Sequence, residues 1–224
     1  MPPRLVNHVN PSDLREIEGY LQAHNLGINK YRVKVNPNHG VSQTLGIVSR
    51  RSLPPDISRC TWAHPRLYKY LMEFAAKYVS VPFTSIQVND NYTCAPHKDV
   101  NNIGESYIVA FGNYTGGTLC VEDFDYNIHY RGLLFDGSQL LHWTKPWIGH
   151  RYSIVFHSLE PKDRWLNHVP SLSEYEVIEH EGRWKIRRLS DGALFWGKQG
   201  LPHPLKYRRV NQMLQESPGL EIQS

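Results

Sequence analysis

The sequence contains few cysteines and no long apolar run, and each absence excludes a class of protein. Only three of the 224 residues are cysteine, widely spaced and without a C-x-x-C pair, so neither a disulfide framework nor a structural zinc site is expected. No stretch approaches the roughly 18 apolar residues that a membrane-spanning helix needs, and the N-terminal residues lack a signal-peptide pattern. We therefore expect a soluble intracellular protein, cytoplasmic or nuclear, with no membrane contact and no disulfide-linked partner.

A strong excess of charge of one sign is also absent. The 25 Lys and Arg exceed the 21 Asp and Glu by only four. This mild surplus permits a polyanionic partner but is smaller than that of proteins that bind nucleic acid through basic tails. With 40% hydrophobic residues and no internal repeat, the chain can bury one good-sized core.

The N-terminal third predicts helices and strands that support this core. Residues 11–25 and 64–80 place apolar side chains at helical spacing, and each follows a helix-start signal, so both are expected to be amphipathic helices. The alternation of apolar and polar residues over 31–49 predicts two short strands around a Pro-Asn-His-Gly turn.

After residue 81 the pattern changes to short apolar runs separated by Gly, Asn and Asp turns, which is typical of a sandwich or barrel of short strands. The runs are residues 83–88, 106–111, 118–121, 132–135 and 152–156. Three further segments, 174–180, 183–188 and 194–196, predict a small C-terminal meander joined by Glu-Gly and Asp-Gly turns.

The predicted fold is therefore mainly β with flanking helices (α+β), in three parts. Residues 1–80 would support the core, 81–160 would form the β core, and 161–224 would form a β extension and tail.

A metal-ligand pattern lies in the predicted β core. His97 and Asp99 are separated by one residue, and His142 follows 45 residues after His97. Side chains two apart in an extended segment project to the same side, so His97 and Asp99 can face one ion. Two imidazoles and one carboxylate leave positions open on Fe(II). We predict His97, Asp99 and His142 as the metal ligands.

Other histidines compete for the place of the third ligand. They are His129, His150, His157 and His168. His150 directly precedes Arg151, a candidate for binding a carboxylate, so a metal ligand at His150 would leave no spacing between the two sites. His157 lies at the far end of its predicted strand. His142 is therefore preferred.

Polar residues near the metal motif could hold an organic acid. Arg151 and Ser153 share one face of an apolar strand, and a guanidinium fork with a hydroxyl suits a carboxylate. Asn89, Asn91 and Tyr107 lie on or near strands beside the metal motif. Each could contact co-substrate or substrate, or could equally solvate the rim of the barrel.

At these residues the sequence resembles the 2-oxoglutarate/Fe(II) oxygenase superfamily, and within it the TET/JBP branch of methylcytosine and thymine dioxygenases. The resemblance covers residues 81–160. The superfamily motifs are His97-x-Asp99, His142 and Arg151-x-Ser153; the branch motifs are Asn89-x-Asn91, Asp99-x-Asn-Asn-x-Gly-x-Ser106, Phe111-Gly-x-Tyr-x-Gly-Gly-x-Leu119 and Arg151-Tyr-Ser-Ile-Val-Phe156.

The resemblance implies a double-stranded β-helix, a jelly-roll or cupin-like fold that holds Fe(II) and the co-substrate 2-oxoglutarate in its mouth. The implied activity uses O₂, releases succinate and CO₂, and hydroxylates a substrate, with ascorbate as a candidate stimulant. Arg151 and Ser153 would bind 2-oxoglutarate, and Asn89 and Tyr107 would be further contacts.

The branch resemblance implies that the substrate is a methylated base, 5-methylcytosine or thymine, in DNA or RNA. Reaching such a base requires its extraction from the stack and a cationic track beside the mouth. Residues 183–209 carry eight Lys or Arg against one acid, with aromatic residues between them. The candidates for nucleic-acid contact are Lys185, Arg187, Arg188, Arg208 and Arg209. A solvated hairpin whose aromatic residues form its own core is the alternative.

Two other functions remain open. The chain is short and carries no zinc finger or DNA-reading module, so the substrate could instead be a protein side chain, an amino acid or a small metabolite. A non-catalytic β-helix binding module is the third possibility, and the intact ligand set argues against it.

Overall fold

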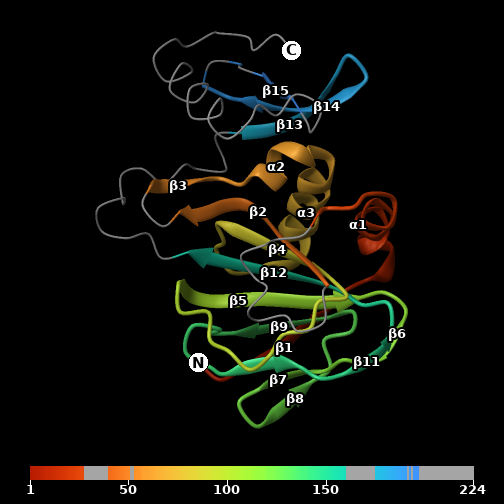
Figure 1. Ribbon diagram of the computed structural model, residues 1–224, viewed down its shortest axis with the longest axis vertical. Coiled ribbons are helices and arrows are strands. Elements are labelled where there is room, and N and C mark those ends of the chain that lie inside the picture. The colour runs from red at the N-terminus through yellow and green to blue at the C-terminus, as the bar shows by residue number, and fades with distance from the viewer. Residues whose placement is uncertain (28–39, 51–52, 160–174, 191, 193, 197–224) are drawn as a thin grey trace.

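The computed structural model describes residues 1–27, 40–50, 53–159, 175–190, 192 and 194–196 (Figure 1). The strand expected over residues 31–35 lies outside these residues, as do His168, Arg208 and Arg209. Among the described residues, no helix combines the length and the apolar character needed to cross a membrane.

A seven-stranded antiparallel sheet dominates the structure, in the order β1-β9-β5-β12-β4-β2-β3. Its strands lie one above another in Figure 1, with β12 at the centre of the order. The bounds are β1 Arg4–His8, β2 Val41–Arg50, β3 Leu53–Ile57, β4 Ser85–Asp90, β5 Asn102–Phe111, β9 Arg131–Phe135 and β12 Tyr152–Leu159.

Two small sheets, β10-β7-β8 and β11-β6, accompany the large one, and β13-β14-β15 forms a separate C-terminal sheet. Their bounds are β6 Tyr114–Gly116, β7 Leu119–Val121, β8 Phe124–Tyr126, β10 His142–Thr144, β11 Trp147–Gly149, β13 Tyr175–His180, β14 Arg183–Arg188 and β15 Leu194–Trp196. The C-terminal sheet packs beside α2, where Ile186 joins a buried cluster with Ile57 and Trp62.

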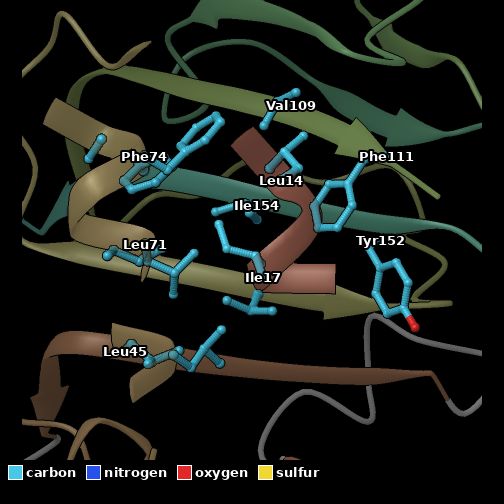
Figure 2. Close-up of a cluster of buried hydrophobic side chains, with 14 of the residues drawn as sticks. Leu14, Ile17, Leu45, Leu71, Phe74, Val109, Phe111, Tyr152 and Ile154 are labelled. Atoms are coloured by element: carbon cyan, nitrogen blue, oxygen red, sulfur yellow. The ribbon is translucent and has the colours of Figure 1, made fainter. Parts of the chain in front are cut away.

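Three helices complete the described structure: α1 Pro11–Ala23, α2 Arg59–Ala63 and α3 Pro65–Tyr78. Asn10 caps α1, its side chain accepting a hydrogen bond from the Ser12 amide at 3.0 Å. Both long helices bury the apolar faces that their spacing predicts. Leu14 and Ile17 of α1 point into the cluster that Figure 2 shows, and so do Leu71 and Phe74 of α3.

Strand alternation divides the apolar residues of the large sheet between two cores. One core contains Val109, Phe111, Ile154 and the two helices. The other contains Ile108 with residues of the small sheets, such as Leu119 and Val121. Neighbouring residues of one strand thus serve opposite layers. Helices cover one face of the large sheet and small sheets cover the other, which confirms the predicted mainly β class with flanking helices.

Several elements escaped prediction because their local signals are weak. β3 contains Pro54 and Pro55, which argue against a strand in the middle of a sheet, but β3 is an edge strand, where proline is tolerated. β6, β8, β10 and β11 have only three residues each, too few for a periodic pattern. The proposed division at residues 80/81 and 160/161 stays a prediction; β1, β2 and β3 complete the same sheet as β4, β5, β9 and β12.

We expect Phe156→Ala to lower the free energy of unfolding by about 3–5 kcal/mol, because Phe156 is fully buried and packs against Phe74, Phe83 and Tyr107. Phe124→Ala is the matched control: this side chain is 68% exposed, so its loss should change stability by less than about 0.5 kcal/mol. Urea denaturation measures both. Equal effects of the two substitutions would contradict the assigned core.

Candidate metal centre

Backbone hydrogen bonds bring the three predicted metal ligands together. His97 and His142 form an isolated antiparallel bridge, with N to O distances of 3.1 and 3.0 Å in the two directions. The Asp99 amide donates to the Gly137 carbonyl at 2.8 Å. The segment after β4 is thus tied to β10, which places the distant third residue beside the His-x-Asp pair.

The side chains of this trio converge. Asp99 Oδ1 lies 3.6 Å from His97 Nε2, and Asp99 Oδ2 lies 3.6 Å from His142 Nε2. One ligand atom from each residue lies within 4.8 Å of the other two, and no other group of three His, Cys, Asp or Glu in the described part of the chain does so. One ion can therefore be reached by all three side chains.

Hydrogen bonds to backbone carbonyls orient both imidazoles. His97 Nδ1 donates to the Ala95 carbonyl at 2.7 Å, and His142 Nδ1 donates to the Leu140 carbonyl at 2.9 Å. With Nδ1 carrying the proton, Nε2 of each ring is unprotonated and lies 3.6 Å from an Asp99 carboxylate oxygen. This is the tautomer and the supporting contact that metal-binding histidines commonly have. The donor set fits a divalent metal such as Fe(II).

Access to the trio is uneven. The His142 side chain is only 7% exposed and its ring lies edge-on to Phe135, whereas the Asp99 side chain is 27% exposed. The His97 side chain is 17% exposed, so solvent reaches the trio at Asp99 and His97 rather than at His142.

The competing histidines lie elsewhere. His150 Nε2 pairs with Asp90 Oδ1 at 2.7 Å, and His129 Nε2 donates to the Gly112 carbonyl at 3.0 Å. His157 pairs with Ser85 in the register of β12 and β4, at the end of β12 remote from Arg151. Of the histidines that the structure describes, His142 is the one brought to the His97 and Asp99 pair.

Arg151 is buried, and part of its guanidinium group has no hydrogen-bond partner in the part of the chain that the structure describes. The residue is 2% exposed, and its Nε and Nη2 have no hydrogen-bond partner among the described residues. Its Cζ lies 5.5 Å from the ring centroids of both Tyr114 and Trp147. Desolvation lowers the pKa of Arg151. Unsatisfied buried donors are costly, and a carboxylate would satisfy them.

Asn91 holds the backbone of Arg151 in place. The Arg151 amide donates to Asn91 Oδ1 at 2.9 Å, and the Asn91 amide donates to the Arg151 carbonyl at 2.8 Å. Asn91 has φ 46°, a conformation that asparagine tolerates better than most residues. The sequence is compatible with Asn91 as a ligand contact or as a rim residue; in the structure Asn91 positions the main chain of Arg151.

Cys94 links the trio to Arg151. Its Sγ lies 3.6 Å from His97 Nε2, and Cys94 slightly raises the pKa of Arg151. The chain also connects the two sites directly, because a Cβ at Gly117 would lie 3.1 Å from Arg151 Nε and β7, which starts two residues later, pairs with His142. Arg151 and the predicted metal ligands therefore border one region of the molecule. Only the motif position of Tyr114 hinted at its place beside Arg151, and no pattern pointed to Trp147 or Cys94.

The other predicted co-substrate contacts lie on two different faces of the large sheet. Asn89 Nδ2 donates to Ser153 Oγ at 3.1 Å, so Asn89 and Ser153 lie on the face that Arg151 occupies. Tyr107 does not: it packs against Phe74 and Phe156 in the helix-facing core, and its hydroxyl donates to Asn7 Oδ1. The expected contact of Tyr107 with co-substrate is wrong, because alternation along β5 turns this side chain to the helices.

The predicted basic face is also corrected. Lys185 is 1% exposed, with its Nζ 2.9 Å from His180 Nδ1 and 3.3 Å from Glu181 Oε2. Arg187 forms an ion pair with Glu176 across β13 and β14. Lys185 is thus not available to phosphate, and Arg187 is neutralised by the neighbouring strand. Arg188 is half-buried on β14.

No protein-family model matches the sequence, and a search of the curated proteins found no match. The fold is similar to that of NgTET1 in complex with 5mC DNA, at a TM-score of 0.51 and 14% identity over 70% of this chain and 72% of that one. A prolyl hydroxylase from Trichoplax adhaerens, in complex with a hypoxia inducible factor peptide fragment, has a TM-score of 0.47 and 16% sequence identity. The match covers 72% of this chain and 84% of that one. The likeness to NgTET1 confirms the resemblance at the level of the fold, a jelly roll.

Different substitutions should abolish metal binding and weaken co-substrate binding. We expect Asp99→Ala to abolish stoichiometric Fe(II) binding, because it removes the carboxylate between the two imidazoles. Arg151→Ala should retain the metal but lose 2-oxoglutarate affinity by about tenfold or more, since a charge-assisted pair is lost. Anaerobic metal titration and calorimetry measure the two. Full metal binding by Asp99→Ala would contradict the ligand assignment.

Gly117 offers a second test of the anchor. A Cβ at this position would lie 3.1 Å from Arg151 Nε, so Gly117→Ala should displace the guanidinium and weaken 2-oxoglutarate binding, with metal binding unchanged. Gly104→Ala is the matched control, because its φ of 73° is close to the 63° of Gly117 but its Cβ would meet nothing within 4 Å. Equal affinities in the two variants would show that space beside Arg151 does not matter.

Proposed function

We propose that this protein is a 2-oxoglutarate- and Fe(II)-dependent dioxygenase. The observation that carries the proposal is a convergent His97, Asp99 and His142 trio bordering the same region as a buried, incompletely partnered Arg151. Neither the trio nor Arg151 would be sufficient alone. Together they match what a metal-chelating dicarboxylic acid needs at its two ends.

His97, Asp99 and His142 would hold the metal through two Nε2 atoms and one carboxylate. When bound, Fe(II) would supply O₂ activation coupled to oxidative decarboxylation of 2-oxoglutarate, with succinate, CO₂ and a hydroxylated substrate as products. Arg151 would bind the distal carboxylate, and Ser153 would donate a hydrogen bond to it. The protein thus fixes the orientation of the co-substrate relative to the metal.

Aromatic walls strengthen this anchor. Tyr114 and Trp147 flank the Arg151 guanidinium, and their rings exclude water from it. An ion pair in such surroundings is screened less than one at the surface. No side chain is required as a nucleophile or as a general base for the chemical step.

We propose a methylated nucleobase, 5-methylcytosine or thymine in DNA or RNA, as the substrate. The branch motifs around Asp99 and Arg151 support this, as does the likeness to NgTET1, whose structure contains 5mC DNA. The basic stretch gives less support than its composition suggested, because Lys185 is buried and Arg187 is paired with Glu176.

One observation favours the second candidate, a hydroxylase of a protein side chain, an amino acid or a small metabolite. The β7–β8 turn carries exposed Glu122 and Asp123, and it follows Val121, the partner of His142 in the register of β7 and β10. Carboxylates so close to a metal ligand repel a phosphate backbone on that side. A neutral or cationic substrate would meet no such repulsion.

Nucleoside mass spectrometry distinguishes the two candidates. Incubation with Fe(II), 2-oxoglutarate, ascorbate and DNA containing 5-methylcytosine and thymine should add one oxygen to one of these bases, and His97→Ala protein should not. Succinate formation by the wild-type protein without any modified base would keep the enzyme class and favour the second candidate. Absence of both products would contradict the proposed activity.

A further inference from the structure

A continuous row of polar side chains crosses the face of the large sheet that is turned away from the helices. Its members are Thr44 and Ser42 on β2, Gln87 and Asn89 on β4, and Ser153 on β12. The strand register pairs Thr44 with Gln87, Ser42 with Asn89, and Asn89 with Ser153. All except Thr44 are buried, and none is ionisable.

Hydrogen bonds in this row all run in one direction. Thr44 Oγ1 donates to Gln87 Oε1 at 2.7 Å, and Gln87 Nε2 donates to Ser42 Oγ at 2.7 Å. Ser42 Oγ then donates to Asn89 Oδ1 at 2.6 Å. Asn89 Nδ2 donates to Ser153 Oγ at 3.1 Å. Each group accepts from one neighbour and donates to the next, and the chain ends at Ser153.

The direction fixes what Ser153 can do. A hydroxyl has one proton, and an amide has separate donor and acceptor ends. Because Ser42 gives its proton to the Asn89 carbonyl, the Asn89 amide nitrogen must face Ser153. Ser153 Oγ therefore accepts from Asn89 and keeps its own proton, for which the described residues contain no acceptor. Arg151, two residues earlier on the same face, has unpartnered donors as well.

We infer that this polar chain is a positioning device that holds Ser153 as a donor, so that the anchor site selects an ionised carboxylate over a neutral isostere. The inference rests on the proposed function and deepens it. Ser42, Gln87 and Asn89 act through Ser153 and are positioning residues. A carboxylate can accept from both Arg151 and Ser153, whereas the amino group of an amide would meet only donors there.

Loss of the Ser42 hydroxyl should release this constraint. Without its donor, the Asn89 amide can turn over and accept from Ser153, which then presents a lone pair to the ligand. An amide ligand can donate to that lone pair, but a carboxylate cannot. The ratio of the two affinities therefore reports the direction of the chain, whereas a packing defect would weaken both ligands alike.

The test compares 2-oxoglutarate with its 5-amide, 2-oxoglutaramate, by calorimetry on Mn(II)-loaded protein without oxygen. Ser42→Ala should weaken 2-oxoglutarate binding by about tenfold and change the amide affinity by less than about twofold, since a hydrogen bond to a charged group is lost. Ser42→Thr, which restores a hydroxyl, should recover most of the preference. Thermal unfolding checks that each variant is folded.

Ser85→Ala is the matched control. Ser85 is a fully buried serine on β4 whose hydroxyl donates to the Ile47 carbonyl, outside the chain. It should retain the wild-type preference. If Ser42→Ala does not fold, Asn89→Ala removes the donor that occupies the Ser153 lone pair. The Ser153 hydroxyl can then accept from an amide ligand, so the preference for 2-oxoglutarate over the amide should narrow through tighter binding of the amide.

Parallel weakening of both ligands in Ser42→Ala, or an unchanged ratio, would overturn the inference while wild-type binding of 2-oxoglutarate kept the proposed function. Failure of the wild-type protein to bind 2-oxoglutarate would overturn both.

Discussion

The register of β12 between β4 and β5 is the constraint on which the rest of the structure depends. Tyr152, Ile154 and Phe156 face the helices, so Arg151 and Ser153 must face the other layer. A slip of one residue would put a guanidinium among Leu14, Phe74 and their neighbours, and would move three large apolar side chains out of that core. The hydrophobic contacts of the helices thus set the direction in which the polar anchor points.

This arrangement carries a cost in the absence of a ligand. Burial of Arg151 separates its guanidinium from water, and the rings of Tyr114 and Trp147 replace only part of that interaction. Asn91 and the strand pairs hold the backbone, so the side chain cannot relax by a local shift of the main chain. If Arg151 binds a carboxylate as proposed, this unfavourable free energy would be offset on binding, which is how a preorganised site gains affinity.

Prediction from the sequence was most accurate where both the residue types and their spacing along the chain were informative. Both long helices, the central strands β4, β5 and β12, and the C-terminal strands followed from apolar spacing. The convergence of His97, Asp99 and His142 could be predicted because a metal site restricts both the residue types and their spacing; their role as ligands stays a prediction. Tyr107 was assigned wrongly because a polar residue on a strand does not reveal its face until the register is known. Trp147 and Cys94 come near Arg151 only through the pairing of distant strands, which no local pattern encodes.

The basic stretch shows the same limit for electrostatics. Counted along the chain, residues 183–188 carry four positive charges, but β13 pairs beside them in antiparallel register and contributes Glu176 and Glu179. Lys185 then turns inward to His180 and Glu181. Charge that is neutralised across a ladder adds little attraction for phosphate. Among the described residues of β14, Lys185 and Arg187 therefore offer less attraction for phosphate than the composition of the strand suggests. The exposed Glu122 and Asp123 of the β7–β8 turn would repel a phosphate backbone that approached His142 from that side.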